Sequence, residues 1–363
     1  MMADGDRPDP VYPRSGAGSG GAGMVPARAP YHQLRPAYGA LDLGTNNCRL
    51  LIARPDGDGF VIIDAYSRIV RLGEGLMASG RISDIAMQRA IDALGICADK
   101  LRRRRVALSR AVATEACRRA SNGPEFIARV REATGIALDI ISPREEARLA
   151  VLGCHQLLSP GPGPALIFDI GGGSTELVLI DDRDGEPEIL DWASVPWGVV
   201  SLTEHCRHDS ADAVARAAAY EAMRATVRGD IRAFSERIAK RLGGFDGHGP
   251  RLLGTSGTVT TLASLYLGLS SYDRSQVDGL TVDTSDMLAI CHDLADRSVA
   301  ERELIPCIGR ERADLVVAGC AVLEEIAVAW PAERLDVADR GIREGVLRLL
   351  MHGRGAAPME RLQ

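Results

Sequence analysis

Three glycine-rich turns carry the residue types best suited to holding phosphate, and each follows an apolar segment that predicts a strand. The candidate phosphate-binding residues in these turns are Gly44, Thr45 and Asn46; Gly171, Gly172, Gly173, Ser174 and Thr175; and Gly254, Thr255, Ser256 and Gly257. Glycine lets a backbone approach an anion closely, and consecutive amides form a nest for phosphate oxygens. Any one of them could be only a tight turn, but three in one chain indicate phosphate binding.

Three acidic residues accompany the first two turns. Asp42 and Asp169 each lie at the end of an apolar strand, where a carboxylate is costly unless it is paired or bound to a metal. Glu176 lies on the strand that returns from the second turn, which could bring it close to Asp169, although a solvent-facing position is the alternative. Carboxylate oxygens beside a phosphate site suit Mg²⁺.

A predicted helix start supplies a candidate for acid–base chemistry. Ser142 has the residue type of an N-cap, Pro143 fits the first helical position, and Glu145 falls where it would complete a capping box. Glu146 then points about 100° further round the helix. It could orient and deprotonate a water molecule, or it could be an ordinary surface or ion-paired residue.

Arginine follows the predicted strand near residues 106–112. Arg118 could hold phosphate oxygens in a two-pronged contact, or it could belong to a solvated helix face. The run of arginines at residues 102–105 ends a predicted helix, where positive charge is stabilised in any case. His205, Cys206 and His208 resemble a ligand cluster, but structural roles explain them better.

The elements that position these residues form a repeated pattern. Residues 1–37 are rich in Pro and Gly and predict a disordered tail. From Tyr38 the chain reads strand, glycine turn, strand, acidic turn, strand, and the same pattern restarts at Ala165. We interpret this as an internal duplication, with the Pro/Gly segment at 159–164 between the halves. The predicted domains are residues 38–161 and 162–353, followed by a tail at 354–363, in an α/β architecture.

Composition narrows the classes of function. The 46% hydrophobic and 25% charged residues are ordinary for a globular protein. The net charge of −6 argues against general binding of DNA or RNA. No apolar run approaches the ~20 residues of a membrane span, and no secretory signal is recognisable, so we expect a cytoplasmic protein with no membrane partner.

The motifs together resemble a known family. They are "ALDLGTNNCRLLIA", "VATEACRRA", "IISPREEARLAVLG", "IFDIGGGSTELVLI", "WGVVSLTEHC", "LLGTSGTVTTLA" and "DRGIREGVL". In this order they resemble the exopolyphosphatase / guanosine pentaphosphate phosphohydrolase family of the actin, Hsp70 and sugar-kinase superfamily. The resemblance covers about residues 38–350.

The resemblance implies two ribonuclease-H-like domains facing a central cleft. It implies hydrolysis of a terminal phosphate from inorganic polyphosphate or from pppGpp, with Glu146 as the catalytic base. Mg²⁺ would be held by Asp42, Asp169 and Glu176. The glycine turns would cradle phosphate, Arg118 would reach a phosphate, and the protein would form a homodimer.

The sequence departs from the family pattern in three places. Asn47 stands where Ser is frequent, which removes one hydroxyl contact, and Ser201 stands where Arg is frequent, which weakens the expected grip on substrate. The chain stops soon after the "IREGV" helix, whereas longer members continue into a further helical domain. We therefore expect short polyphosphate or a nucleotide to be favoured over long polymers.

Two other functions suit the same fold. An ATP-dependent kinase would need an adenine pocket and an acidic residue to activate its acceptor, and neither can be assigned. A non-enzymatic nucleotide sensor or actin-like assembly protein would bind ligand without turnover. Neither rival requires the paired glutamates at the start of the predicted helix.

Overall fold

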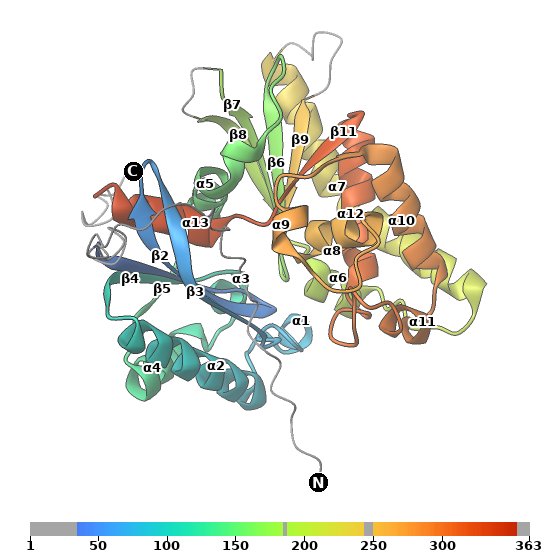
Figure 1. Cartoon of the computed structure of the whole chain (residues 1–363). Coiled ribbons are helices and arrows are strands. Elements are labelled where there is room, and N and C mark those ends of the chain that lie inside the picture. Colours follow the sequence, from blue (N-terminus) through green and yellow to red (C-terminus); the bar gives the residue numbers. More distant parts are fainter. Residues whose placement is uncertain (1–34, 184–186, 243–249, 354–363) are drawn as a thin grey trace, which may run out of the picture. The chain divides into compact units, whose positions relative to one another are not determined.

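Two β-sheets carry the fold of this computed structural model, which describes residues 35–183, 187–242 and 250–353 (Figure 1). The first strand begins at Ala37, one residue before the predicted start. The rest of the predicted N-terminal tail up to residue 34, and the predicted tail at 354–363, lie outside the described residues.

The first sheet has the strand order β3-β2-β1-β4-β5. Its strands are β1 (Ala37–Leu43), β2 (Asn47–Asp56), β3 (Gly59–Ile69), β4 (Val106–Ala113) and β5 (Leu138–Ile140). The first three strands form an antiparallel meander, whereas β1, β4 and β5 run parallel. The glycine turn between β1 and β2 therefore lies at the carboxyl end of the parallel strands, where α/β sheets bind ligands.

The second sheet repeats this path, with the order β10-β11-β9-β6-β7-β8. Its strands are β6 (Ala165–Ile170), β7 (Thr175–Asp181), β8 (Glu188–Val195), β9 (Arg251–Thr255), β10 (Thr281–Asp283) and β11 (Arg334–Ala338). Here β6, β7 and β8 form the meander, and β6, β9 and β11 run parallel. The added antiparallel strand β10 is absent from the first sheet's pattern among the described residues. The common path agrees with the predicted duplication.

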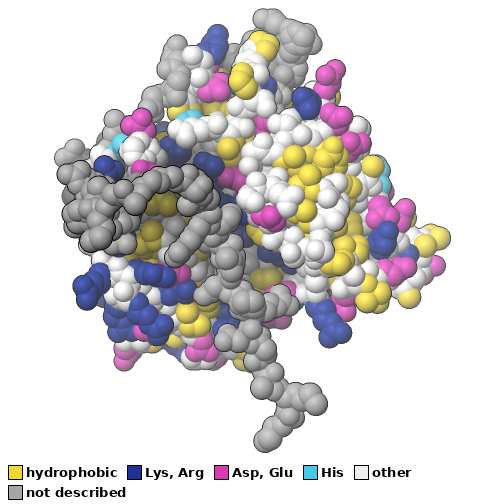
Figure 2. Space-filling view, in the orientation of Figure 1, with side chains coloured by type: hydrophobic (Ala, Val, Ile, Leu, Met, Phe, Trp, Pro, Cys, Tyr) yellow, Lys and Arg dark blue, Asp and Glu magenta, His cyan; other side chains and the backbone are white. Residues whose placement is uncertain are grey.

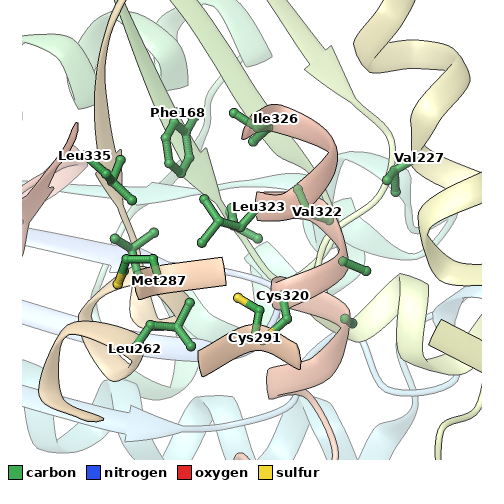
Figure 3. Close-up of a cluster of buried hydrophobic side chains, with 14 of the residues drawn as sticks. Phe168, Val227, Leu262, Met287, Cys291, Cys320, Val322, Leu323, Ile326 and Leu335 are labelled. Carbon is green, nitrogen blue, oxygen red and sulfur yellow. The ribbon is translucent and has the colours of Figure 1, made fainter. Parts of the chain in front are cut away.

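Helices cover both faces of both sheets. Those before the second sheet are α1 (Leu76–Ser79), α2 (Asp84–Arg103), α3 (Glu115–Arg119), α4 (Gly123–Thr134) and α5 (Pro143–Cys154). Those after β8 are α6 (Val199–His205), α7 (Ala213–Leu242), α8 (Gly257–Tyr266), α9 (Arg274–Val277), α10 (Thr284–Asp296), α11 (Val299–Glu303), α12 (Val316–Ala329) and α13 (Ile342–Met351). The largest core joins the second sheet to α7, α8, α10 and α12. Figure 3 shows Phe168 of β6 and Leu335 of β11 close to Leu323 and Ile326 of α12.

We call each sheet, with the helices that pack on it, a lobe. One helix from each half of the chain packs on the sheet of the other half. Helix α5 precedes the second sheet in the chain and packs on it through Ala147 and Val151. Helix α13 ends the described chain but packs on the first sheet, where Val346 and Leu347 meet Leu51. The two helices lie side by side between the sheets (Figure 1). The predicted boundary between residues 161 and 162 stays a prediction, and the packing of these two helices crosses it.

Candidate active site

The three glycine turns open into one cleft between the two sheets. Most of the predicted site residues line it. These are Asp42, Gly44, Thr45, Asn46, Glu146, Asp169, Gly171, Gly172, Gly173, Ser174, Glu176, Thr255, Ser256 and Gly257. Arg118, Thr175 and Gly254 are predicted site residues that do not line the cleft. Acidic and basic side chains are mixed over the surface visible in Figure 2, so positive charge for an anionic substrate must be local.

The first turn leaves several buried oxygens without partners. The amide of Gly44 donates to the carbonyl of Asn47 at 2.9 Å and closes the turn. The side-chain oxygens Asp42 Oδ1, Asn46 Oδ1 and Asn47 Oδ1 are buried and accept no hydrogen bond within the described protein. Because a buried acceptor without a donor is costly, these atoms have the chemistry of ligands for a cation or a donor group. The replacement of a serine hydroxyl by Asn47 thus places an amide in the cleft.

The second turn and Glu176 are held by hydrogen bonds within the second sheet. Gly171 donates its amide to the carbonyl of Ser174 at 2.9 Å. The hydroxyls of Ser174 and Ser194 donate to Glu176 Oε1 at 2.7 and 2.9 Å. Glu176 is 2% exposed and lies directly opposite Asp169 in the β6–β7 ladder. The predicted approach of these two acids is therefore present, and the alternative of a solvent-facing Glu176 is wrong.

The first two turns meet across the cleft. A Cβ atom at Gly172 would lie 2.9 Å from Thr45 Cβ and 3.1 Å from the Asn46 amide nitrogen, so only glycine permits this approach. The candidate phosphate-binding turns of both lobes therefore converge on one place. Ser201, the residue that stands where Arg is frequent, lies behind the second turn and donates its hydroxyl to Gly173 O at 3.2 Å.

The third turn begins helix α8. Ser256 has a left-handed φ of 109° and accepts a hydrogen bond from the Thr258 amide, capping the helix. Gly254 lies within β9 instead, where a Cβ would come within 2.6 Å of the Phe168 ring, so close packing explains this glycine. Thr175 similarly donates its hydroxyl to Trp197 O at 2.8 Å, outside the cleft. The N-terminal amides of helix α8 face the cleft. Gly254 does not line the cleft.

Glu146 is buried in the cleft, with 7% of its surface exposed. The N-cap prediction is confirmed, since the Ser142 hydroxyl accepts from the Glu145 amide at 3.2 Å. The prediction that the Glu145 side chain completes a capping box is wrong. Its carboxylate instead binds Arg110 and Arg148 at 3.0 and 3.3 Å. Glu145 pairs with arginines outside the cleft, whereas Glu146 lines the cleft. Glu146 is itself ion-paired, because Arg118 lies 2.7 Å from its Oε2.

Arg118 does not line the cleft, and its predicted contact with phosphate stays a prediction. Its guanidinium donates to Glu146 Oε2 at 2.7 Å, to Ile141 O at 2.8 Å and to Glu115 Oε2 at 3.0 Å. These acceptors lie on and beside α5, and their negative charge outcompetes an approach to the cleft. The contacts place Arg118 beside Glu146, where it fixes the carboxylate and contributes positive charge.

The acids of the cleft are held in an environment that opposes their ionisation. Burial, followed by the charge of Asp42, raises the pKa of Asp169 to about 6. Burial and the charge of Asp169 raise the pKa of Glu176 to about 7. Burial also raises the pKa of Asp42, and it raises that of Glu146 well above its usual range with help from Glu176. Carboxylates from both lobes thus share one desolvated space, which favours a cation.

The residues fit a magnesium ion that is held jointly with a substrate. Over residues 35–183, 187–242 and 250–353, no three His, Cys, Asp or Glu side chains are close enough to form a complete metal site. The predicted three-carboxylate ligand set is therefore not assembled as a cage. Mg²⁺ needs only one or two carboxylates beside water and phosphate oxygens. The unpartnered Asp42 Oδ1 and the facing Asp169 meet that requirement.

Four arginines of the cleft were not predicted as site residues: Arg49, Arg312, Arg340 and Arg343. Arg49 follows the first turn, and its positive charge lowers the pKa values of Asp42 and Asp169 against the effect of burial. Arg340 binds Asp278 at 2.8 Å. Arg340 and Arg343 lie in the "DRGIREGVL" motif, which was a signal for them, whereas Arg312 lies in no motif.

Comparisons with known proteins agree with this geometry. A model described as the Ppx/GppA phosphatase family matches residues 51–353. Exopolyphosphatase 2 of Mycobacterium tuberculosis is 31% identical over 322 residues, covering 85% of this chain and 96% of that protein. A crystal structure of an exopolyphosphatase from Cytophaga hutchinsonii superposes with a TM-score of 0.73 at 25% identity, covering 87% of this chain and 98% of that one.

The PPX-GPPA enzyme of Aquifex aeolicus superposes with a TM-score of 0.67 at 28% identity, covering 86% of this chain and 99% of that one. These similarities confirm the predicted architecture of two ribonuclease-H-like domains around a cleft. Among the described helices, none is long and apolar enough to cross a membrane.

Proposed function

The chain belongs to the Ppx/GppA phosphatase family, and we propose that it releases the terminal phosphate of inorganic polyphosphate or pppGpp in a magnesium-dependent reaction. The family makes the protein a phosphoanhydride hydrolase. It also displaces the kinase and the non-enzymatic sensor as alternatives. A homodimer and a cytoplasmic location, which the sequence led us to expect, stay predictions.

One observation carries the proposal: a buried glutamate lies in the same cleft as three phosphate-binding turns. Glu146 lines this cleft, and its pKa is raised by burial. A carboxylate with a raised pKa is a better proton acceptor near neutral pH. Arg118, at 2.7 Å, opposes this rise in pKa and orients the carboxylate.

In the proposed reaction, Glu146 accepts a proton from a water molecule as the water attacks the terminal phosphorus in line with the leaving oxygen. The amides of the glycine turns and the guanidinium groups of Arg49 and Arg312 hold the phosphate oxygens. Such fixed donors stabilise the transferring group without reorganisation, which is the main contribution a protein makes to phosphoryl transfer. Asp42 and Asp169 would hold Mg²⁺, which would supply positive charge that neutralises the phosphate.

The lining favours a phosphate chain in particular. Arg49 and Arg312 make no ion pair with a carboxylate within the described chain, so their charge is available to an anion in the cleft. A phosphate chain offers an oxygen-rich surface along its whole length, whereas a nucleoside needs a flat apolar surface at one end. We therefore place short polyphosphate first and pppGpp second as the substrate.

The test is a phosphate-release assay with Glu146→Gln on short polyphosphate, long polyphosphate, pppGpp and ATP, each with and without Mg²⁺. Because the variant keeps its shape but loses its proton acceptor, we expect a loss of about 10²–10⁴-fold in kcat. Glu145→Gln is the matched control, since it changes the neighbouring glutamate outside the cleft and should leave kcat within about twofold. Near-wild-type release by Glu146→Gln would remove Glu146 from the mechanism.

A further inference from the structure

Residues 70–75, which we call the strap, run between β3 and α1 and lie against the first phosphate turn. The amides of Val70 and Arg71 both donate to Asn46 O, at 2.8 and 3.0 Å, and the amide of Gly73 donates to Thr45 O at 2.9 Å. A Cβ at Gly73 would lie 2.2 Å from Thr45 Cγ2. The strap and the phosphate turn therefore move as one piece of backbone.

The strap is held in a strained conformation. Arg71 has a left-handed φ of 45°, which a residue with a side chain rarely adopts without support from its surroundings. Arg89 supplies that support from α2, since its guanidinium donates to Val70 O at 2.9 Å and to Arg71 O at 3.1 Å. The strained backbone aims the Arg71 side chain away from its own lobe.

The strap binds the second lobe at two points. The Arg71 guanidinium donates to both carboxylate oxygens of Asp314, at 3.2 and 3.3 Å, and to Glu311 O at 3.1 Å. The Gly75 amide donates to Glu204 Oε1 at 2.8 Å. These contacts join residues 129 to 243 positions apart in the chain. They lie at the strap, whereas other contacts between the lobes run through α5 and α13 and through the approach of Gly172 to Thr45.

The segment that Arg71 binds also carries a cleft cation. Arg312 lies between Glu311 and Asp314 and lines the cleft, where its Nη1 donates to Thr261 Oγ1 at 3.1 Å. Its pKa is lowered by burial and by the positive charge of Arg49, which belongs to the other lobe. Two cations on opposite lobes thus repel each other across the cleft when no anion lies between them.

We propose that Arg71 is a positioning residue that holds the first phosphate turn and the Arg312 segment together across the cleft before substrate binds. The Arg71–Asp314 pair opposes the repulsion between Arg49 and Arg312, so the cations are already in place when a polyanion enters. The inference deepens the proposed function and rests on it for its kinetic consequence. Its structural consequence, a closed free enzyme, does not need turnover.

The kinetic test uses Arg71→Asn, because asparagine tolerates a left-handed φ and keeps the strap's backbone. We expect KM for short polyphosphate to rise about two- to fivefold, the effect of one partly exposed ion pair, with kcat within about twofold once bound substrate bridges the cations. Arg81→Ala is the control, since it removes an exposed pair with Glu125 inside the first lobe. An unchanged KM, or a fall in kcat alone, would overturn the proposal.

A double-mutant cycle separates the pair from general disturbance. Asp314→Asn should raise KM as Arg71→Asn does, and the double variant should be no worse than either one, because both remove the same interaction. Additive effects would show that the two residues act independently and would contradict the assignment.

Hydrogen exchange without substrate keeps this test distinct from that of the proposed function. Arg71→Asn should speed amide exchange in residues 44–47, 70–75 and 309–315 and leave α2 unchanged. If that occurs while the wild type hydrolyses none of the substrates, the proposed function is wrong and the positioning contact stands. If exchange in the free enzyme is unchanged in all three segments, the inference is wrong whatever the activity.

Discussion

The two strand–turn–strand units at the floor of the cleft have the same backbone and different chemistry. In both, a glycine amide closes the turn with a 2.9 Å hydrogen bond, from Gly44 in the first lobe and from Gly171 in the second. In the second unit, Glu176 Oε1 accepts from two serine hydroxyls. In the first unit, Asp42 Oδ1 accepts from none within the described residues.

The difference shows how a duplicated element can be divided between structure and binding. In the second unit, Glu176 already has donors, whereas Asp169 on the preceding strand lines the cleft as a candidate magnesium ligand. The first unit has buried oxygens that only a cation, water or substrate can satisfy, so its stability and its geometry depend on what occupies the cleft. We therefore assign Glu176 and its two serine donors to the rigid frame of the second turn, and the unpartnered oxygens of the first turn to contacts with ion and substrate.

Separating the two turns should have the largest effect. Gly172→Ala places a methyl group 2.9 Å from Thr45 Cβ, which forces the turns apart, and a displacement near 1 Å can cost about 10²-fold in rate. We expect phosphate release to fall by about that factor. Gly95→Ala, in an open position of α2, is the control and should keep full activity. Normal activity of Gly172→Ala would mean that the turns do not act together.

Removing the carboxylate of Asp42, whose Oδ1 has no hydrogen-bond donor among the described residues, should have the second largest effect. Asp42→Asn deletes a predicted magnesium ligand. We expect the Mg²⁺ concentration for half-maximal activity to rise by at least about tenfold, because losing even a residue that only supports a metal ligand costs about that much affinity. The free protein should not lose stability, because a costly buried carboxylate becomes neutral. Mg²⁺ titrations of activity and thermal unfolding in chelator measure the two effects. A destabilised variant with an unaltered Mg²⁺ requirement would reverse the assignment of the first turn.

Measuring stability against pH without metal should show how much the buried acids of the cleft lower the free energy of unfolding. Burial raises the pKa of Asp169 to about 6 and that of Glu176 to about 7 in the folded protein, from ordinary values of 3.8 and 4.5. The folded state therefore binds more protons than the unfolded state between about pH 4 and pH 7, so these groups lower the free energy of unfolding as pH rises through that window.

The contribution of the two acids is measured as the difference in Tm between wild type and Asp169→Asn/Glu176→Gln. In chelator, the wild type should lose stability relative to the double variant from about pH 4 to pH 7, and Mg²⁺ should restore it. A difference that stays constant with pH would show that the acids are not crowded in the free protein.

The sequence allowed the two turns to be predicted because their signals are local. A glycine after an apolar strand, beside small hydroxyl residues, defines a turn whatever lies around it. The direction in which Glu146 points around its helix could likewise be worked out from the cap at Ser142. The contrast between the turns could not be predicted, because it depends on Ser194, which comes from a different strand and lies 18 residues beyond Glu176.

Contacts made at long range escaped prediction for the same reason. Arg118 and Arg312 are both arginines near glycine turns, yet one is bound by Glu146 and the other faces the cleft. Which of the two occurs depends on whether a carboxylate from another element lies within reach. The exchange of α5 and α13 was also hidden, since a helix's periodicity shows that it has an apolar face and not which sheet covers it.

The smallest effect we predict is also the sharpest comparison of the turns. Ser174→Ala removes one of two donors to Glu176 and leaves Ser194 in place, so we expect a loss of about 1 kcal/mol in the free energy of unfolding, the usual value for one hydrogen bond. Activity should fall only a few-fold, since the second hydroxyl still orients the carboxylate. Because Asp42 has no such donor, the free energies of unfolding of Ser174→Ala and Asp42→Asn, both measured in chelator, should move in opposite directions from wild type. If both variants lost stability equally, the first turn would have to be as complete without a ligand as the second.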